Sequence, residues 1–255
     1  MKNFVEFIMH PFYKKRRKHQ ALVSRVSILG ILVDHLIESP KWTESEETGF
    51  NGQKNRKLIF KDLLNAFQFD AIIETGTYVG NTAGFMAKIS NLPVYTCELK
   101  RQFNTLAKLR LKDIPNIAFA LSDSRVFLRS LSAVNTLKIK RPFIYLDSHW
   151  YEEYLPLQEE LEIICNGWKD FVVMIDDFQV PGDDGYGYDS YGKKKPLSLK
   201  VFSKVMSKCE LIPFFPILSS GEETGFKRGC VVLARKGNFS ETLSSLKSLC
   251  KKSYA

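Results

Sequence analysis

Two glycines lie in a short segment that could bind a cofactor. The segment, residues 74–82, follows the apolar residues 71–73 and precedes a helix-like stretch over 83–89. Glycine at positions 76 and 80 allows a sharp turn and a close approach of a ligand to the backbone. A helix that begins after such a turn points its free N–H groups at the ligand. The candidate cofactor contacts are therefore Glu74, Gly76, Thr77, Tyr78, Gly80 and Thr82. An ordinary strand-to-helix turn is the alternative.

An acidic residue ends the next apolar segment. Residues 93–97 predict a strand, and Glu98 follows where a doubly wound sheet presents a carboxylate to ribose hydroxyls. A dinucleotide pyrophosphate needs a further glycine inside the turn, where this chain has Thr77 and Tyr78. Glu74 would repel a pyrophosphate but attract an ammonium group. These features favour S-adenosylmethionine, which has a ribose and an ammonium group but no phosphate.

Three carboxylates follow two other apolar segments. Residues 143–146 precede Asp147, and residues 171–175 precede Asp176 and Asp177. If the two strands are neighbours, the carboxylates converge and repel one another unless a cation is present. Their oxygen atoms suit Mg²⁺ best, with Ca²⁺ or Mn²⁺ as alternatives. Helix caps or Asx turns are the competing interpretation.

A histidine lies two residues beyond Asp147. An imidazole at position 149 would reach a substrate hydroxyl beside the metal and take its proton near neutral pH. We therefore expect His149 and Asp147 to be the catalytic residues. A histidine with only a surface or packing role is the alternative.

Alternating helices and strands must position these residues. Helices are expected over 58–67, 81–90, 100–111, 124–132, 153–166 and 198–207, and strands over 70–74, 93–98, 116–121, 142–147 and 171–176. This alternation predicts an α/β fold with a Rossmann-like, doubly wound, mostly parallel sheet. Two later apolar segments, 211–218 and 229–234, predict a closing antiparallel hairpin. Functional residues should gather at the carboxyl ends of the parallel strands.

A long glycine-rich and tyrosine-rich loop precedes the last of these helices. The loop of residues 178–197 is too long to be a simple connection between two elements. We expect a lid in which Tyr186 and Tyr188 contact the substrate. A solvated loop is the alternative.

Residues 1–55 are expected to form a helical appendage to a domain of residues 56–255. Residues 1–20 combine aromatic side chains with the basic cluster 14–18, a pattern that would attach reversibly to an anionic membrane. Packing on the protein itself or in a homo-oligomer is the alternative, as is a cover over the active site. Residues 42–55 are polar and predict a linker or mobile loop.

Composition favours one well-packed domain that does not bind nucleic acid. The chain has 255 residues, of which 44% are hydrophobic. Its net charge of +9 is not arranged in a stripe with aromatic residues, and no nucleic-acid motif accompanies it. The five cysteines are scattered and lack a Cys-x-x-Cys spacing, which favours a reducing compartment. We expect a cytoplasmic protein, with peripheral contact at the inner membrane face as a variant of that location.

The chain from about residue 58 to residue 236 resembles the class I S-adenosylmethionine-dependent methyltransferases. The stretch Leu-Asp-Ser-His-Trp-Tyr-Glu-Glu-Tyr-Leu-Pro, with the later Ile-Asp-Asp, resembles metal-dependent O-methyltransferases of the catechol and macrocin types. The resemblance implies that Glu74, Gly76 and Gly80 hold the methionine part, Glu98 the ribose, and Asp123 with Ser124 the adenine. It implies a divalent metal on Asp147, Asp176 and Asp177.

The chain departs from the catechol pattern at two positions. Ser148 is inserted between the aspartate and the histidine, and Tyr151 stands where a lysine base would follow the tryptophan. The macrocin type is more similar in using a histidine near the metal aspartate, so His149 remains the expected base, with Tyr151 near the substrate. We expect methyl transfer to a hydroxyl of a sugar, nucleotide-sugar or glycan. A non-catalytic nucleoside-binding subunit, or another reaction such as hydroxylation, is the alternative.

Overall fold

A computed structural model describes residues 30, 48–133, 139–148, 155–191 and 195–252. Contacts divide the chain into two units, Met1–Glu44 and Ser45–Ala255, and the second contains nearly all of the described residues. The predicted membrane-binding residues 1–20 lie outside the described residues. Within the described part, no helix is long and apolar enough to cross a membrane.

One sheet organises the second unit. Its strands follow the order β3-β2-β1-β4-β5-β7-β6-β8. In chain order they are β1 (Ala71–Thr75), β2 (Val94–Glu98), β3 (Ile117–Leu121), β4 (Pro142–Leu146), β5 (Val172–Ile175), β6 (Leu211–Pro216), β7 (Val231–Arg235) and β8 (Leu249–Cys250). Neighbouring strands from β3 to β5 pair in parallel, whereas β7 is antiparallel to β5 and β6. The predicted fold class and the predicted antiparallel pair are therefore confirmed.

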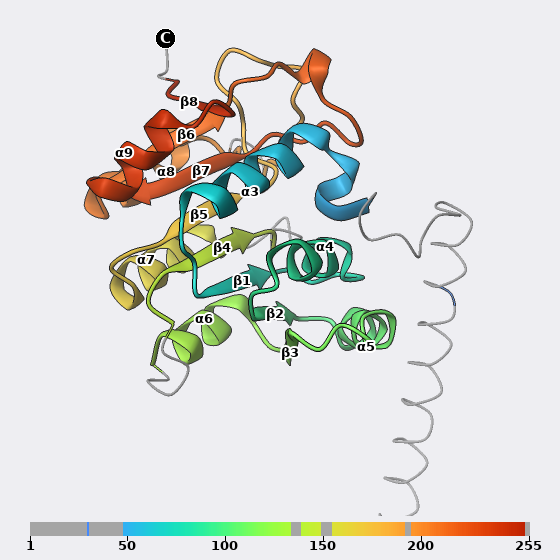
Figure 1. Ribbon diagram of the computed structural model, residues 1–255. Coiled ribbons are helices and arrows are strands. Elements are labelled where there is room, and N and C mark those ends of the chain that lie inside the picture. The colour runs from blue at the N-terminus through green and yellow to red at the C-terminus, as the bar shows by residue number, and fades with distance from the viewer. Residues whose placement is uncertain (1–29, 31–47, 134–138, 149–154, 192–194, 253–255) are drawn as a thin grey trace, which may run out of the picture. The chain divides into compact units, whose positions relative to one another are not determined.

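Helices cover both faces of the sheet (Figure 1). They are α3 (Lys54–Ala66), α4 (Asn81–Ser90), α5 (Arg101–Arg110), α6 (Ser124–Ala133), α7 (Leu157–Gly167), α8 (Leu199–Lys208) and α9 (Asn238–Ser245), with short 3₁₀ helices η1 (Gly49–Gly52) and η3 (Ser220–Glu222). Strands β1, β4 and β5 are buried along their whole length because helices pack on either side. Strand order reverses beside β1, so the carboxyl ends of β1 and β4 form a crevice where such folds bind ligands.

The two faces of the sheet have separate hydrophobic cores. Successive side chains of a strand point to opposite faces. Ile73 accordingly packs with residues of α6, α7 and α8, whereas Ile72 packs with residues of α3, α4 and α9. This alternation explains why the central strands are apolar at every position.

The structure corrects the prediction of a loop over residues 48–55. This segment forms η1 and the first turn of α3, which begins at Lys54 and not near residue 58. The predicted domain boundary between residues 55 and 56 falls inside α3. The Phe50 side chain is fully buried, and its ring contacts the rings of Phe60, Phe85 and Tyr145. A single aromatic anchor in a polar stretch gives no periodic signal, which is why the sequence pattern missed it.

Replacing Phe50 with alanine should destabilise the domain by about 3–5 kcal/mol, because the removed ring leaves a cavity. The matched control is Phe226→Ala, at a ring that is 77% exposed, which should change the free energy of unfolding by about 0.5 kcal/mol or less. Urea denaturation measures both. Equal, small losses for the two variants would show that η1 is not part of the domain core.

Candidate functional site

A pocket lies at the carboxyl ends of β1, β2 and β3. It contains about 820 Å³ of empty space, a volume that includes solvent at its open mouth. Five predicted cofactor contacts line it, namely Gly76, Tyr78, Glu98, Asp123 and Ser124. The remaining lining residues are Cys97, Leu99, Lys100, Phe103, Ser122, Arg125, Ser148 and Pro156. Five of these eight residues lie within two positions of Glu98 or Asp123, so their nearness in sequence could have indicated them.

The turn after β1 requires glycine at position 76. Gly76 has a φ of +88°, and a Cβ atom there would lie 2.2 Å from the backbone oxygen of Asp147. The turn is held to β2 because the N–H groups of Gly76 and Thr77 both donate to the Cys97 carbonyl at 3.0 Å. Tyr78 also has a positive φ, of 48°, and its ring packs on Phe103 with centroids 4.5 Å apart. The turn thus forms one wall of the pocket.

The Glu98 carboxylate is fixed beside the pocket by backbone donors. The N–H of Tyr78 donates to one oxygen at 2.9 Å, and the N–H of Lys100 donates to the other at 2.8 Å. A carboxylate has about four acceptor positions, so these bonds leave capacity for the hydroxyls of a ribose. Glu98 thus ends β2 and lines the pocket, and its contact with a ribose stays a prediction.

Glu74 lies behind the pocket wall and does not line it. Its side chain is 1% exposed, and the Thr96 hydroxyl donates to Oε2 at 2.5 Å. Burial, with a smaller contribution from the charge of Glu98, raises the pKa of Glu74 to about 8. A cationic group nearby would favour the charged form and reverse this shift.

The other predicted contacts outside the pocket lining have structural partners. The Thr77 hydroxyl lies 2.5 Å from the Thr96 hydroxyl. Gly80 caps α4 with a φ of +86°, and a Cβ there would lie 2.6 Å from Leu111. The Thr82 hydroxyl accepts the N–H of Phe50 at 3.2 Å, so it holds η1 in place. These residues shape the turn without facing the pocket.

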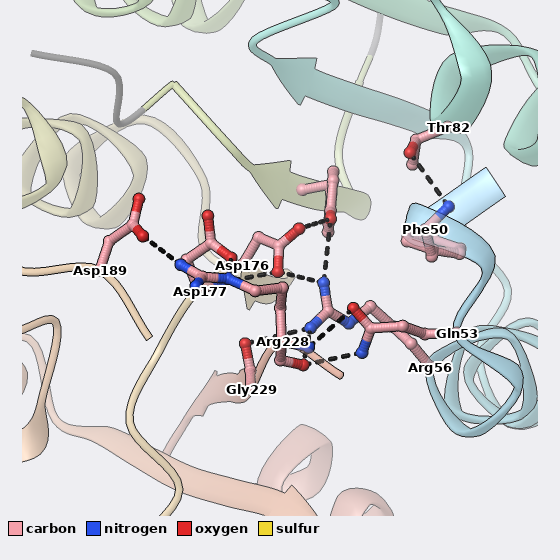
Figure 2. A network of polar contacts seen from close by, with 10 residues as sticks. Phe50, Gln53, Arg56, Thr82, Asp176, Asp177, Asp189, Arg228 and Gly229 are labelled. Carbon is pink, nitrogen blue, oxygen red and sulfur yellow. Dashed lines mark hydrogen bonds and ion pairs between the residues drawn. The ribbon is translucent and has the colours of Figure 1, made fainter. Parts of the chain in front are cut away.

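The three predicted metal ligands do lie at one edge of the sheet, because β4 and β5 are neighbours. Asp176 is fully buried; the Tyr145 hydroxyl donates to its Oδ2 at 2.5 Å, and the Asp177 N–H to its Oδ1 at 2.6 Å. Figure 2 shows that the Arg56 guanidinium forms an ion pair with this carboxylate. Asp177 forms an ion pair with Arg228 at 2.5 Å.

Like charges at this edge change the ionisation of the aspartates. Removal from solvent, followed by the charges of Asp176, Asp177 and Glu74, holds the pKa of Asp147 well above its usual range. Burial and the charge of Asp176 raise the pKa of Asp177 to about 7, although Arg228 opposes the rise.

These contacts do not fit the predicted divalent metal. In the described part of the chain, no three Asp, Glu, His or Cys side chains are grouped to hold a metal ion. Asp176 and Asp177 are each engaged by an arginine. The local sequence pattern does not indicate Arg56 and Arg228, because they are 120 and 51 positions away from their partners. The predicted base His149 and the predicted substrate residue Tyr151 lie outside the described residues.

The loop predicted as a lid, residues 178–197, is packed into the domain over the part that is described. Tyr186 is 1% exposed, and its hydroxyl donates to the Leu218 carbonyl at 3.1 Å. The prediction that Tyr186 contacts a substrate is therefore wrong, because its ring fills the hydrophobic core. Tyr188 is 38% exposed and remains able to contact a ligand.

The fold is similar to that of solved methyltransferase structures. A candidate O-methyltransferase from Klebsiella pneumoniae matches with a TM-score of 0.53 and 14% identity, over 72% of this chain and 81% of that one. TomG, an O-methyltransferase from Streptomyces achromogenes involved in tomaymycin synthesis and solved with SAM, matches with a TM-score of 0.50 and 16% identity, over 71% and 79%. The methyltransferase domain of bacterial CtHen1 matches with a TM-score of 0.50 and 16% identity, over 71% and 98%.

No family model matches the sequence, and no curated protein matches it. At these identities the structural likeness establishes the fold alone. The chain has a Rossmann-like methyltransferase fold.

Replacing Glu74 with glutamine should make the stability of the ligand-free protein less dependent on pH. In the unfolded chain Glu74 loses its proton near pH 4.5, whereas in the folded chain Glu74 keeps its proton until about pH 8. The unfolded state therefore binds fewer protons between these values, and stability falls as pH rises through this window. At pH 8 the glutamine variant should be more stable than wild type by about 1–3 kcal/mol.

Urea denaturation at pH 4.5 and pH 8 measures this difference. The control is Glu241→Gln at an exposed position of α9, which should leave the decline unchanged. If the free energy of unfolding of Glu74→Gln fell with pH as steeply as that of wild type, the raised pKa of Glu74 would be contradicted.

Proposed function

We propose that the chain transfers a methyl group from S-adenosylmethionine to a hydroxyl oxygen of a small molecule or glycan. The observation that carries the proposal is the pocket at the carboxyl ends of β1–β3, where Gly76, Glu98, Asp123 and Ser124 meet. The likeness to TomG, an O-methyltransferase solved with SAM, supports the same cofactor and reaction here.

Each pocket residue has a role in this proposal. Glu98 accepts hydrogen bonds from the ribose hydroxyls, and Asp123 with Ser124 contacts the adenine. Leu99 and Phe103 supply apolar surface for the purine ring. Glu74 lies near enough to the turn to attract the ammonium group through the field of its carboxylate, and the ammonium would in turn keep it ionised.

Bound S-adenosylmethionine supplies an electrophilic methyl group on a sulfonium. The protein's contribution is to align an acceptor oxygen with that methyl group and to remove the hydroxyl proton. We assign proton removal to His149 from its sequence position, two residues beyond Asp147 at the end of β4. No metal takes part in this proposal, because arginines engage Asp176 and Asp177.

The acceptor class that we propose is a sugar, nucleotide-sugar or glycan. Its support is the polar edge formed by Asp147, Asp177 and Asp189, together with the exposed ring of Tyr188. Carboxylates accept hydrogen bonds from several hydroxyls, and a tyrosine ring packs on the face of a sugar.

Isothermal titration calorimetry should detect S-adenosylhomocysteine binding to the wild-type protein. Glu98→Ala should weaken binding by about 1–3 kcal/mol, since buried hydroxyls then lose their acceptor. Glu241→Ala, on the exposed side of α9, is the matched control and should bind as wild type does. Binding of NAD in place of S-adenosylhomocysteine would overturn the cofactor assignment.

Transfer of a labelled methyl group to a panel of sugar nucleotides and glycans tests the reaction. His149→Ala should lower turnover by about 10²–10⁴-fold, with little change in cofactor affinity, and should abolish the decline of activity at low pH. Near-wild-type turnover in this variant across the pH range would remove His149 as the base. Tight S-adenosylhomocysteine binding without turnover of any acceptor would favour a non-catalytic nucleoside-binding subunit.

A further inference from the structure

We infer that Arg56 and Arg228 take the place of a divalent cation at an acidic edge of the sheet. This edge consists of Asp176 and Asp177, which follow β5, and Asp189 in the next loop, and the arginines make it stable without a metal. The inference concerns the stability of the folded domain and does not depend on the reaction proposed above. It rests on the completeness of the contacts around Asp176 and on the position of Arg228 between two carboxylates.

Both oxygens of Asp176 are already satisfied by donors from the protein. Oδ1 accepts from the Arg56 guanidinium and from the Asp177 N–H, and Oδ2 accepts from the Tyr145 hydroxyl. Arg56 is 1% exposed, so this ion pair is excluded from water. A metal ion on the same carboxylate would have to displace a buried guanidinium, which carries its own positive charge and cannot be deprotonated.

The Arg56 guanidinium is also held by backbone carbonyls, which accept hydrogen bonds from its second terminal nitrogen, Nη2. Nη2 donates to the carbonyl of Gly229 at 3.1 Å and to that of Arg228. Moving the guanidinium away would leave buried carbonyls and a buried carboxylate without partners. Figure 2 shows these contacts converging from the start of α3 and from the segment that leads into β7.

Arg228 joins two further carboxylates as a bound cation would. Its Nε donates to Asp177 at 2.5 Å, and its Nη2 forms an ion pair with Asp189. Gln53 fixes the backbone of Arg228 from both sides: Nε2 donates to its carbonyl at 2.7 Å, and Oε1 accepts its N–H at 3.1 Å. The guanidinium is therefore held in register with both aspartates.

Replacing Arg228 should convert this edge into a cation-binding site. The Arg228 side chain is 27% exposed, so Arg228→Met is expected to fold with a lowered thermal midpoint. Asp177 and Asp189 would then lose the arginine that forms an ion pair with each of them. Millimolar Mg²⁺ or Mn²⁺ should therefore raise the midpoint of the variant by roughly 2–4 °C. The midpoint of wild type should not change with either metal or with EDTA, and elemental analysis of purified wild type should find no stoichiometric divalent ion.

Three further variants isolate the cause. Arg235→Met removes the arginine that ends β7, which donates to the carbonyls of Cys165 and Trp168, so it should lower the midpoint without producing a metal response. Arg228→Lys keeps a positive charge and should show no response. Arg228→Met combined with Asp177→Asn and Asp189→Asn should lose the response of the single variant.

Two results would overturn the inference. One is a wild-type protein that holds a stoichiometric divalent ion or gains stability from Mg²⁺. The other is an Arg228→Met variant that folds but does not respond to either metal. If Arg228→Met fails to fold, the wild-type measurements with metal, EDTA and elemental analysis still decide the question.

Discussion

The buried ion pair between Arg56 and Asp176 connects the start of α3 to the carboxyl end of β5. Taking two charges out of water is costly, and the cost is offset only when both groups have good geometry and further hydrogen bonds. Here the Tyr145 hydroxyl and the carbonyl of Gly229 provide those bonds. Because loss of one partner would strand the other charge in the interior, this pair fixes the relative positions of α3, β4, β5 and the segment before β7.

The fold joins two electrostatically different regions. The pocket at β1–β3 has a carboxylate, Glu98, whose oxygens are already oriented by backbone N–H groups. The neighbouring edge at β4 and β5 collects Asp147, Asp176 and Asp177, whose mutual repulsion is offset by two arginines. A carboxylate with oriented acceptor positions thus lies beside an edge whose negative charge is compensated within the protein.

The similarity of fold to solved structures explains the position of the pocket but not the arginine contacts at the ends of β4 and β5. The fold cannot select an acceptor, because one fold can support many unrelated reactions. The pocket residues lie where the strand order reverses, which is where folds of this class bind ligands irrespective of their reaction. The arginine contacts of the acidic edge come from α3 and from the segment before β7.

The sequence by itself determined the features that depend on residues close together in the chain, namely the strands, the helices and the turn after β1. The alternation of apolar strands and amphipathic helices predicted the parallel sheet, and the glycine at position 76 predicted the turn, because only glycine tolerates its φ of +88° beside the Asp147 backbone. Glu98 was predicted for the same reason, since a residue that ends a parallel strand must lie at the ligand-binding edge.

Tertiary structure alone decided which charges meet. The sequence predicted that Asp147, Asp176 and Asp177 lie at one edge and that a divalent metal is their cation. The folded chain brings Arg56 and Arg228 to two of them from 120 and 51 positions away. It also buries Phe50 and Tyr186, which lie in polar or glycine-rich stretches. Local periodicity does not predict such contacts. They depend on tertiary packing, which decides which side chains from distant parts of the sequence are buried against one another.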